Sequence, residues 1–282
     1  MGLKVMAAQR SAGLPGGLPN EDRTGFKATP VGFYAWVIDG GTSPDPSLRT
    51  PDGRLAGAWL ADQTSDALWA VTEGGGDLRA MLRGAAERVA PAWRAMRLDW
   101  PDWAAPVGAV SFLRLRPEGG GLSVEGLHLA DCPVAILRAD GRVAPLHAWA
   151  SDGSDEARRL TSDEAGHAVM IDALKAKRAR QQTERPARLL TLDPACAADA
   201  AASAARLEAG DRLIVASDGI ARAWTEYGLL GAEDGARRLA DAAGFEALLG
   251  EMRAFEQGDY AKREDRLMKI GDDASTVIVA VD

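Results

Sequence analysis

Short apolar runs that begin or end beside acidic residues recur along this chain. Runs of this length, rich in β-branched and aromatic residues, predict strands. A carboxylate at the end of a strand is held by a rigid scaffold, so we expect acids in this position to converge where several strand ends meet. The three clearest cases are Gly32–Ile38 followed by Asp39-Gly40, Asp211–Ala216 followed by Ser217-Asp218-Gly219, and Asp272-Asp273 before Ser275–Val281.

The order of the predicted elements indicates an α+β protein. Strands occur in runs and helices in pairs, without regular βαβ alternation, which favours a layered sandwich with antiparallel sheets over a doubly wound fold. The predicted strands are Leu3–Gln9, Gly32–Ile38, Val107–Arg116, Leu122–Leu129, Val134–Arg138, Arg142–His147, Leu189–Leu192, Asp211–Ala216 and Ser275–Val281. The predicted helices are Asp62–Val71, Asp77–Met96 with a break or kink at Pro91, Asp163–Gln182, Asp193–Leu207, Ala232–Ala243 and Phe245–Gln257. We find no convincing linker and expect one domain over residues 1–282.

Composition excludes several classes of function. The formal net charge is −8, and an acidic protein lacks the basic footprint that nucleic-acid binding requires. The only two cysteines, Cys132 and Cys196, have no zinc-site spacing and fit a reducing compartment. The start of the sequence lacks the apolar core of a signal peptide, and no apolar run approaches the ~20 residues of a membrane span. We therefore expect a cytoplasmic protein with neither nucleic-acid nor membrane partners.

Converging carboxylates have a direct chemical consequence. They repel one another as water is excluded, and divalent cations such as Mg²⁺ and Mn²⁺, which take oxygen ligands, remove that cost. A glycine after the aspartate lets the backbone turn sharply and leaves its carbonyl available. A single Asp-Gly pair is also a common turn signal, so we interpret Asp140-Gly141 and Asp152-Gly153 as turns. The joint pattern is more specific than any one pair.

Five motifs, in order, resemble the metal-dependent serine/threonine phosphatases of type 2C, including their bacterial branch. The resemblance runs from about residue 3 to residue 281. The matching segments are Asn20–Asp22 for the early acidic motif, Trp36–Gly41 for the strand followed by Asp-Gly, Leu127–Arg138 for the Gly-Asp-Ser-Arg hairpin, Asp211–Ile220, and Asp273–Val279 for the terminal strand.

The resemblance implies a four-layer α-β-β-α sandwich of two mostly antiparallel sheets, with two Mn²⁺ or Mg²⁺ ions at one end. It implies hydrolysis of phosphoserine or phosphothreonine on a protein substrate by a metal-activated water. By the same resemblance, Asp39, Asp218 and Asp273 are the catalytic metal ligands, with Glu21 and the carbonyl of Gly40 completing the metal set. Asp22 orients the ligands or their waters without binding a metal itself, while Asp131 and Asp272 are either structural or linked to the metals.

The sequence departs from the family pattern at several positions. The early phosphate-binding arginine is replaced by Gly17, so the group that binds phosphate is unknown, with Arg10, Arg23 and Arg222 as candidates. The histidine that many relatives carry after Asp-Gly is Gly41 here. Arg222 also stands where relatives often have an aspartate for a third metal, and Asp131-Cys132-Pro133 replaces Asp-Ser-Arg. These departures keep open an alternative function, a phosphatase-like binding or regulatory module with weak catalysis.

A basic stretch, Lys175–Arg180, lies on a predicted helix. In the resembling family a variable flap beside the active site occupies roughly this segment. The stretch is either a solvated helix face or a surface that steers a phosphorylated, acidic partner.

Overall fold

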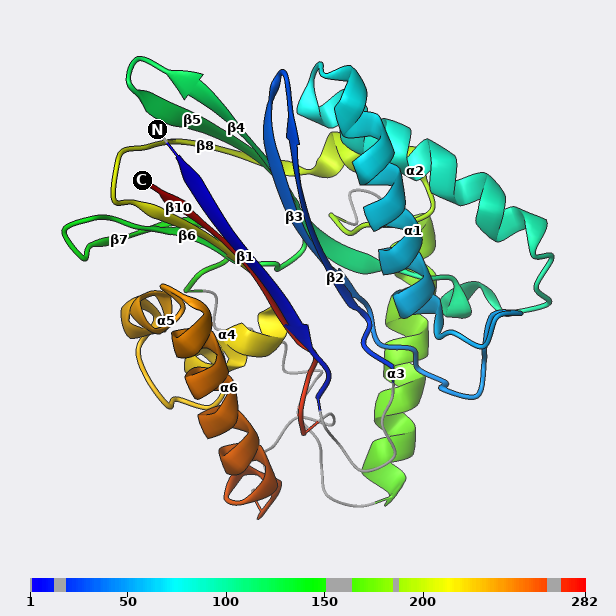
Figure 1. Ribbon diagram of the computed structural model, residues 1–282. Coiled ribbons are helices and arrows are strands. Elements are labelled where there is room, and N and C mark those ends of the chain that lie inside the picture. The colour runs from blue at the N-terminus through cyan, green and yellow to red at the C-terminus, as the bar shows by residue number, and fades with distance from the viewer. Residues whose placement is uncertain (1, 13–18, 151–163, 185–187, 263–269) are drawn as a thin grey trace.

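Two five-stranded sheets lie face to face at the centre of the molecule (Figure 1). The computed structural model describes residues 2–12, 19–150, 164–184, 188–262 and 270–282; Gly17 and the predicted turn Asp152-Gly153 lie outside these ranges. The first sheet has the order β1 (Leu3–Arg10), β10 (Ala274–Val281), β9 (Arg212–Ala216), β6 (Val134–Leu137), β7 (Val143–His147). The second has the order β2 (Asp22–Thr29), β3 (Gly32–Gly40), β4 (Gly108–Glu118), β5 (Gly121–Leu129), β8 (Ala201–Leu207). All neighbouring strands pair antiparallel.

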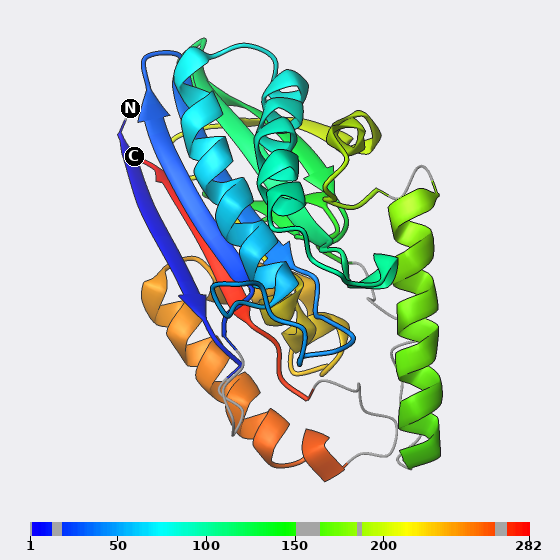
Figure 2. The same ribbon diagram turned by 90° about the vertical axis from the view of Figure 1, so that its right-hand side faces the viewer.

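Helices cover the outer face of each sheet, which completes the predicted four layers (Figure 2). The second sheet is covered by α1 (Ala56–Val71) and α2 (Leu78–Ala95), and the first by α4 (Asp218–Thr225), α5 (Ala232–Arg238) and α6 (Ala242–Gln257). Helix α3 (Glu164–Thr183) stands apart from these and contacts the short helix η2 (Asp102–Ala104). The other short 3₁₀ helices are η1 (Thr72–Gly74), η4 (Pro194–Asp199) and η5 (Tyr260–Lys262).

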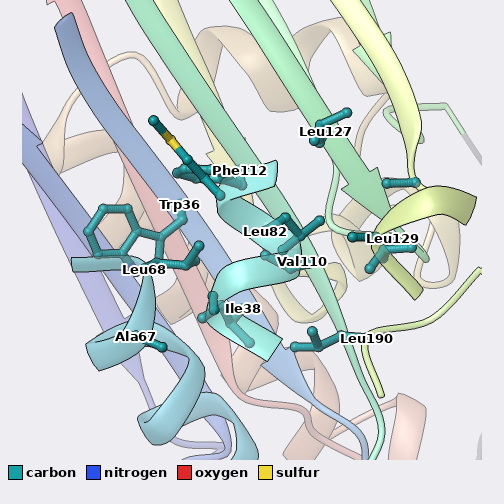
Figure 3. Packing of buried hydrophobic residues seen from close by; sticks show 14 of the residues in the cluster. Trp36, Ile38, Ala67, Leu68, Leu82, Val110, Phe112, Leu127, Leu129 and Leu190 are labelled. Carbon is teal, nitrogen blue, oxygen red and sulfur yellow. The ribbon is translucent and has the colours of Figure 1, made fainter. Parts of the chain in front are cut away.

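Strand β3 shows why the run 32–38 is apolar throughout. Successive side chains of a strand point to opposite faces, and both faces of β3 are buried. Tyr34, Trp36 and Ile38 pack under α1 and α2, whereas Phe33, Ala35 and Val37 pack against the first sheet. Figure 3 shows the helix-facing side, where Trp36 and Ile38 lie among residues of α1, α2, β4 and β5.

The outer face of the first sheet has its own core. Ile214 of β9 and Ile278 of β10 pack against Phe245, Leu248 and Met252 of α6. Each sheet is therefore fixed on both sides, and the ends of its strands are held in place by packing.

Three expectations about the elements were wrong. The alanine-rich segment 193–207 is not one helix: η4 is followed by β8, which pairs with β5 along its whole length. Residues 189–192 form only an isolated bridge between Leu190 and Gly108. Pro91 does not break α2, which continues to Ala95. In the described ranges no helix combines the length and apolar character needed to cross a membrane.

Candidate functional site

The pairing of β2 with β3 brings the first two acids together. Asp22 and Asp39 are directly opposite each other in this antiparallel pair. The Gly40 N–H donates to the Glu21 carbonyl at 3.1 Å, just beyond the last pair. Because paired strands share their ends, Glu21, Asp22, Asp39 and Gly40 all lie at one end of the second sheet.

The pairing of β9 with β10 brings two more acids together in the first sheet. The last residue of β9, Ala216, pairs with Thr276 of β10. Asp218, which follows β9, and Asp273, which precedes β10, therefore lie at the same end of the first sheet. The two chain segments are joined by backbone: Ser217 N–H donates to the Ser275 carbonyl at 2.9 Å, and Ser275 N–H donates to the Ser217 hydroxyl at 2.9 Å.

Asp273 links the two sheets. Its carboxylate accepts hydrogen bonds from the Glu21 N–H at 2.7 Å and from the Ala12 N–H at 3.0 Å. Asp273 is 6% exposed and Glu21 2% exposed. The acidic segments at the ends of the two sheets are therefore joined by a hydrogen bond.

Two glycines permit this close approach. A Cβ on Gly40 would lie 2.5 Å from the backbone of Gly57 and 2.7 Å from the Glu21 carbonyl oxygen. A Cβ on Gly219 would lie 1.7 Å from the carbonyl oxygen of Asp273. Any side chain at either position would push the acidic segments apart.

The carboxylates raise the pKa values of one another. Loss of hydration raises the pKa of Asp39 well above its usual range, and the charges of Asp218, Asp22 and Asp272 raise it further. Burial raises the pKa of Asp22 to about 8, while the hydroxyls of Ser275 and Ser217 partly offset that shift. The fully charged cluster is therefore unfavourable without added positive charge.

The donor set fits divalent cations of the Mg²⁺ and Mn²⁺ type, because it consists of carboxylate and carbonyl oxygens. The Oδ2 atom of Asp22 is buried and makes no hydrogen bond within the described ranges. Over the same ranges, no three acidic, histidine or cysteine side chains form a ready-made ligand group. The paired strands nevertheless bring the acids near one another, and the charge of Asp218 acts on Asp39.

The structure places Asp272 and Asp131 in different surroundings. Asp272 lies at the site: its charge acts on both Asp22 and Asp39, and its carboxylate is 3.9 Å from Arg222 Nη1. Asp131 lies in the turn between β5 and β6, beside the buried Cys132, whose pKa is raised by burial and then by the charges of Asp39 and Asp131.

Two of the three candidate phosphate-binding arginines have carboxylate partners outside the acidic cluster. Arg10 pairs with Glu246 at 2.6 Å, and Arg23 pairs with Asp62 of α1. The third, Arg222, is 5% exposed and lies over the ring of Tyr227 at 4.9 Å.

Three residues that build the site were not predicted from the sequence. Ser217 and Ser275 are fully buried beside Asp22, and Gly57 at the start of α1 lies against Glu21, because a Cβ at 57 would be 2.7 Å from Glu21 Oε1. The serines had a signal, since each stands within two residues of an acid at a strand end. Gly57 had none, because it lies before the predicted helix Asp62–Val71 and beside no predicted strand.

Comparison of the structure with solved proteins identifies the fold. It matches the S. agalactiae serine/threonine phosphatase with TM-score 0.58, 16% identity, and coverage of 99% of this chain and 100% of that one. The catalytic domain of serine/threonine phosphatase PstP, solved with two manganese ions, matches with TM-score 0.55, 18% identity and 99% coverage of both chains. The PP2C phosphatase domain of SpoIIE from Bacillus subtilis matches with TM-score 0.53, 17% identity, and coverage of 99% and 64%. No family model matches the sequence, and no curated protein matches it. The chain thus has the type 2C phosphatase fold predicted from its motifs.

Proposed function

We propose that this chain hydrolyses phosphomonoesters in a metal-dependent reaction, with phosphoserine and phosphothreonine of proteins as substrates. The observation that carries the proposal is the convergence of Asp39 from one sheet with Asp218 and Asp273 from the other, in a cluster whose charges raise the pKa of Asp39. The shared fold of serine/threonine phosphatases supports the substrate class.

In this proposal Glu21, Asp39, the carbonyl of Gly40, Asp218 and Asp273 hold two Mn²⁺ or Mg²⁺ ions. Such ions, when bound, lower the pKa of water and polarise a phosphoryl oxygen. The protein supplies the ligands and their placement. Asp273 fixes the distance between the sheets through the amides of Ala12 and Glu21.

Asp22 has a different role from these ligands, because it is only 1% exposed. It faces Ser217 and Ser275, which belong to the segments that carry Asp218 and Asp273. We infer that Asp22 orients these segments and exchanges a proton as the charge of the site changes, rather than contacting the substrate.

The test is hydrolysis of p-nitrophenyl phosphate with and without Mn²⁺, together with metal binding measured by calorimetry. Wild-type protein should turn over only with the cation, and Asp39→Asn and Asp218→Asn should each abolish turnover and weaken Mn²⁺ binding. Asp66→Asn is the matched control, because Asp66 lies exposed on α1, outside the cluster. Wild-type protein that binds two metal ions yet shows no turnover would refute the proposal.

A phosphatase-like binding module is the second candidate. It is favoured by the placement of the candidate arginines, since Arg10 and Arg23 pair with Glu246 and Asp62 outside the acidic cluster. Binding of a phosphopeptide by metal-loaded protein, with no release of phosphate, would establish this function in place of the first.

A further inference from the structure

Helix α3 brings an arginine to the backbone beside the acidic cluster. Arg178 Nη2 donates a hydrogen bond to the carbonyl oxygen of Thr42 at 3.3 Å. A Cβ on Gly41 would lie 2.7 Å from Nη2 and 2.9 Å from Nη1 of the same guanidinium. The group therefore lies against residues 41 and 42, which directly follow Asp39 and Gly40.

Gly41 makes this position available. A Cβ there would meet the guanidinium and also the Val107 carbonyl oxygen at 2.9 Å, so a side chain at 41 would displace Arg178 or the backbone of residue 107. The residue is not a turn glycine of the left-handed region, since its φ is not among the positive values in the chain. The requirement at position 41 is therefore room for a neighbour rather than backbone freedom.

The helix that carries Arg178 is anchored on the other side. Gln182 Nε2 donates to the Ala105 carbonyl at 3.0 Å, and Lys175 Nζ lies 4.9 Å from the centre of the Trp103 ring. These contacts with the segment around η2 hold the last turns of α3 in place, so the guanidinium is positioned by a helix rather than by a mobile loop.

The chemistry of the group fits a phosphate. A guanidinium is always charged and presents five N–H donors in a planar fork that matches two phosphate oxygens. Arg178 is only partly buried, unlike Arg222 at 5% exposure. A charge in this place also opposes the negative potential of the acidic cluster, which would otherwise repel a phosphate dianion.

We propose that Arg178 is the residue that binds the phosphoryl group of the substrate, in a position opened by Gly41. The inference rests on the proposed function and adds to it the phosphate-binding group that the sequence left unknown. Within the basic stretch 175–180, the inference assigns phosphate binding to Arg178 alone.

The experiment compares Arg178→Met, Arg178→Lys and the control Arg180→Met, since Arg180 is an exposed arginine two positions further along the same helix. With saturating Mn²⁺, we measure KM and kcat for p-nitrophenyl phosphate and inhibition by inorganic phosphate. Arg178→Met should raise KM and the phosphate inhibition constant about tenfold to a hundredfold, the usual cost of losing a charged hydrogen-bond pair. Arg178→Lys should fall between wild type and Arg178→Met, and Arg180→Met should match wild type.

The affinity for Mn²⁺ separates binding of phosphate from a general structural effect, and it should be unchanged in Arg178→Met. If wild type turns over and Arg178→Met keeps its phosphate inhibition within about twofold, which is inside ordinary context effects, the role of Arg178 is refuted while the proposed function stands. If wild type does not turn over, calorimetric binding of inorganic phosphate to the Mn²⁺-loaded proteins decides. Loss of binding in Arg178→Met supports the inference, and equal or absent binding in wild type and variant overturns it.

Discussion

Asp22 shows, at the scale of a single residue, how burial among other acids keeps a carboxyl group protonated. Its pKa is raised to about 8 by burial, with Asp273 and Asp272 adding to the shift. A protonated aspartate is neutral, so at pH 7 the folded protein without cations holds a proton that the unfolded chain has released. The contribution of Asp22 to the free energy of unfolding of the cation-free protein should therefore fall as pH rises from about 4 to about 8.

Cation binding should release this proton. At pH 7 we expect Mn²⁺ binding to liberate protons from Asp39 and Asp22, whose pKa values burial raises, and the share from Asp22 to decline above pH 8 as it ionises without help. Calorimetry in buffers of different ionisation enthalpy measures the number. Asp22→Asn should release fewer protons, and heats that do not depend on the buffer in wild type would contradict the assignment.

At Gly219, a single added methyl group should lower both activity and stability. A Cβ at this position would lie 1.7 Å from the Asp273 carbonyl oxygen, which is backbone and cannot move alone. Gly219→Ala should displace Asp218 from Asp273, lower phosphatase turnover at least about tenfold, and destabilise the fold by about 1–3 kcal/mol.

The control for this change is Gly250→Ala on the exposed side of α6, where an added Cβ meets nothing within 4 Å. It should stabilise the protein slightly, by about 0.5–1 kcal/mol, because alanine favours a helix over glycine. Urea unfolding and p-nitrophenyl phosphate hydrolysis measure both variants. Equal behaviour of the two would show that the approach of Gly219 to Asp273 is unimportant.

At the scale of elements, a buried histidine ties three strands of the second sheet together. His128 of β5 contacts the Ser111 hydroxyl of β4 through Nδ1 at 2.9 Å and the Ser203 hydroxyl of β8 through Nε2 at 2.7 Å. Its ring stacks on His147 with centroids 4.3 Å apart. Burial, and then the charge of His147, lowers the pKa of His128 from 6.5 to about 3.

This network should make stability depend on pH in the acid range. Folded His128 stays neutral while the unfolded chain binds a proton below pH 6.5, so the contribution of His128 to stability is lost as pH falls from 6.5 towards 3, opposite in sign to the contribution of Asp22. The loss can reach about 1.4 kcal/mol per pH unit. His128→Gln should weaken this dependence when urea unfolding is compared at pH 7 and pH 5. Parallel losses in wild type and variant would exclude His128 as the cause.

The sequence predicted most elements of both sheets, and its errors have physical causes. Apolar strands such as β3 and β10 are buried on both faces, so their composition alone identifies them. Strand β8 is mostly alanine, a helix former, and becomes a strand because β5 offers it a full set of backbone partners. Strand β2 lies at a sheet edge and carries charged and polar residues, so it has no apolar run to reveal it.

Asp39, Asp218 and Asp273 could be singled out because each stands beside an apolar run in the sequence, whereas Glu21 and Asp22 stand at the start of the unpredicted strand β2 and were named only through the family resemblance. Contacts between distant segments could not be predicted. The approach of Gly57 to Glu21 and of Arg178 to Gly41 depends on where helices α1 and α3 pack, and no local pattern encodes that. The structure therefore adds mainly the residues that come from helices.

At the scale of the whole molecule, the proposed ligands come from both sheets. Asp39 belongs to the second sheet, and Asp218 and Asp273 adjoin strands of the first. Ions bound between them would hold the two layers together, so cation binding should stabilise the entire fold rather than one loop.

Thermal unfolding tests this expectation. Mn²⁺ at about a hundred times its Kd should add about 2.7 kcal/mol to the free energy of unfolding, and a chelator should remove the gain. Asp39→Asn should lose most of the cation-dependent shift in Tm, whereas Asp66→Asn should keep it. A Tm that does not respond to Mn²⁺ in wild type would mean that the acids do not bind ions in the folded state.

The position of β10 has a consequence for how the protein is made. This strand is the last of the described elements along the chain, yet it lies inside the first sheet between β1 and β9. During synthesis on the ribosome, the second sheet and its two covering helices can assemble before β10 has emerged, but Asp273 is then missing. We expect a nascent chain to be unable to bind the proposed ions until β10 has docked.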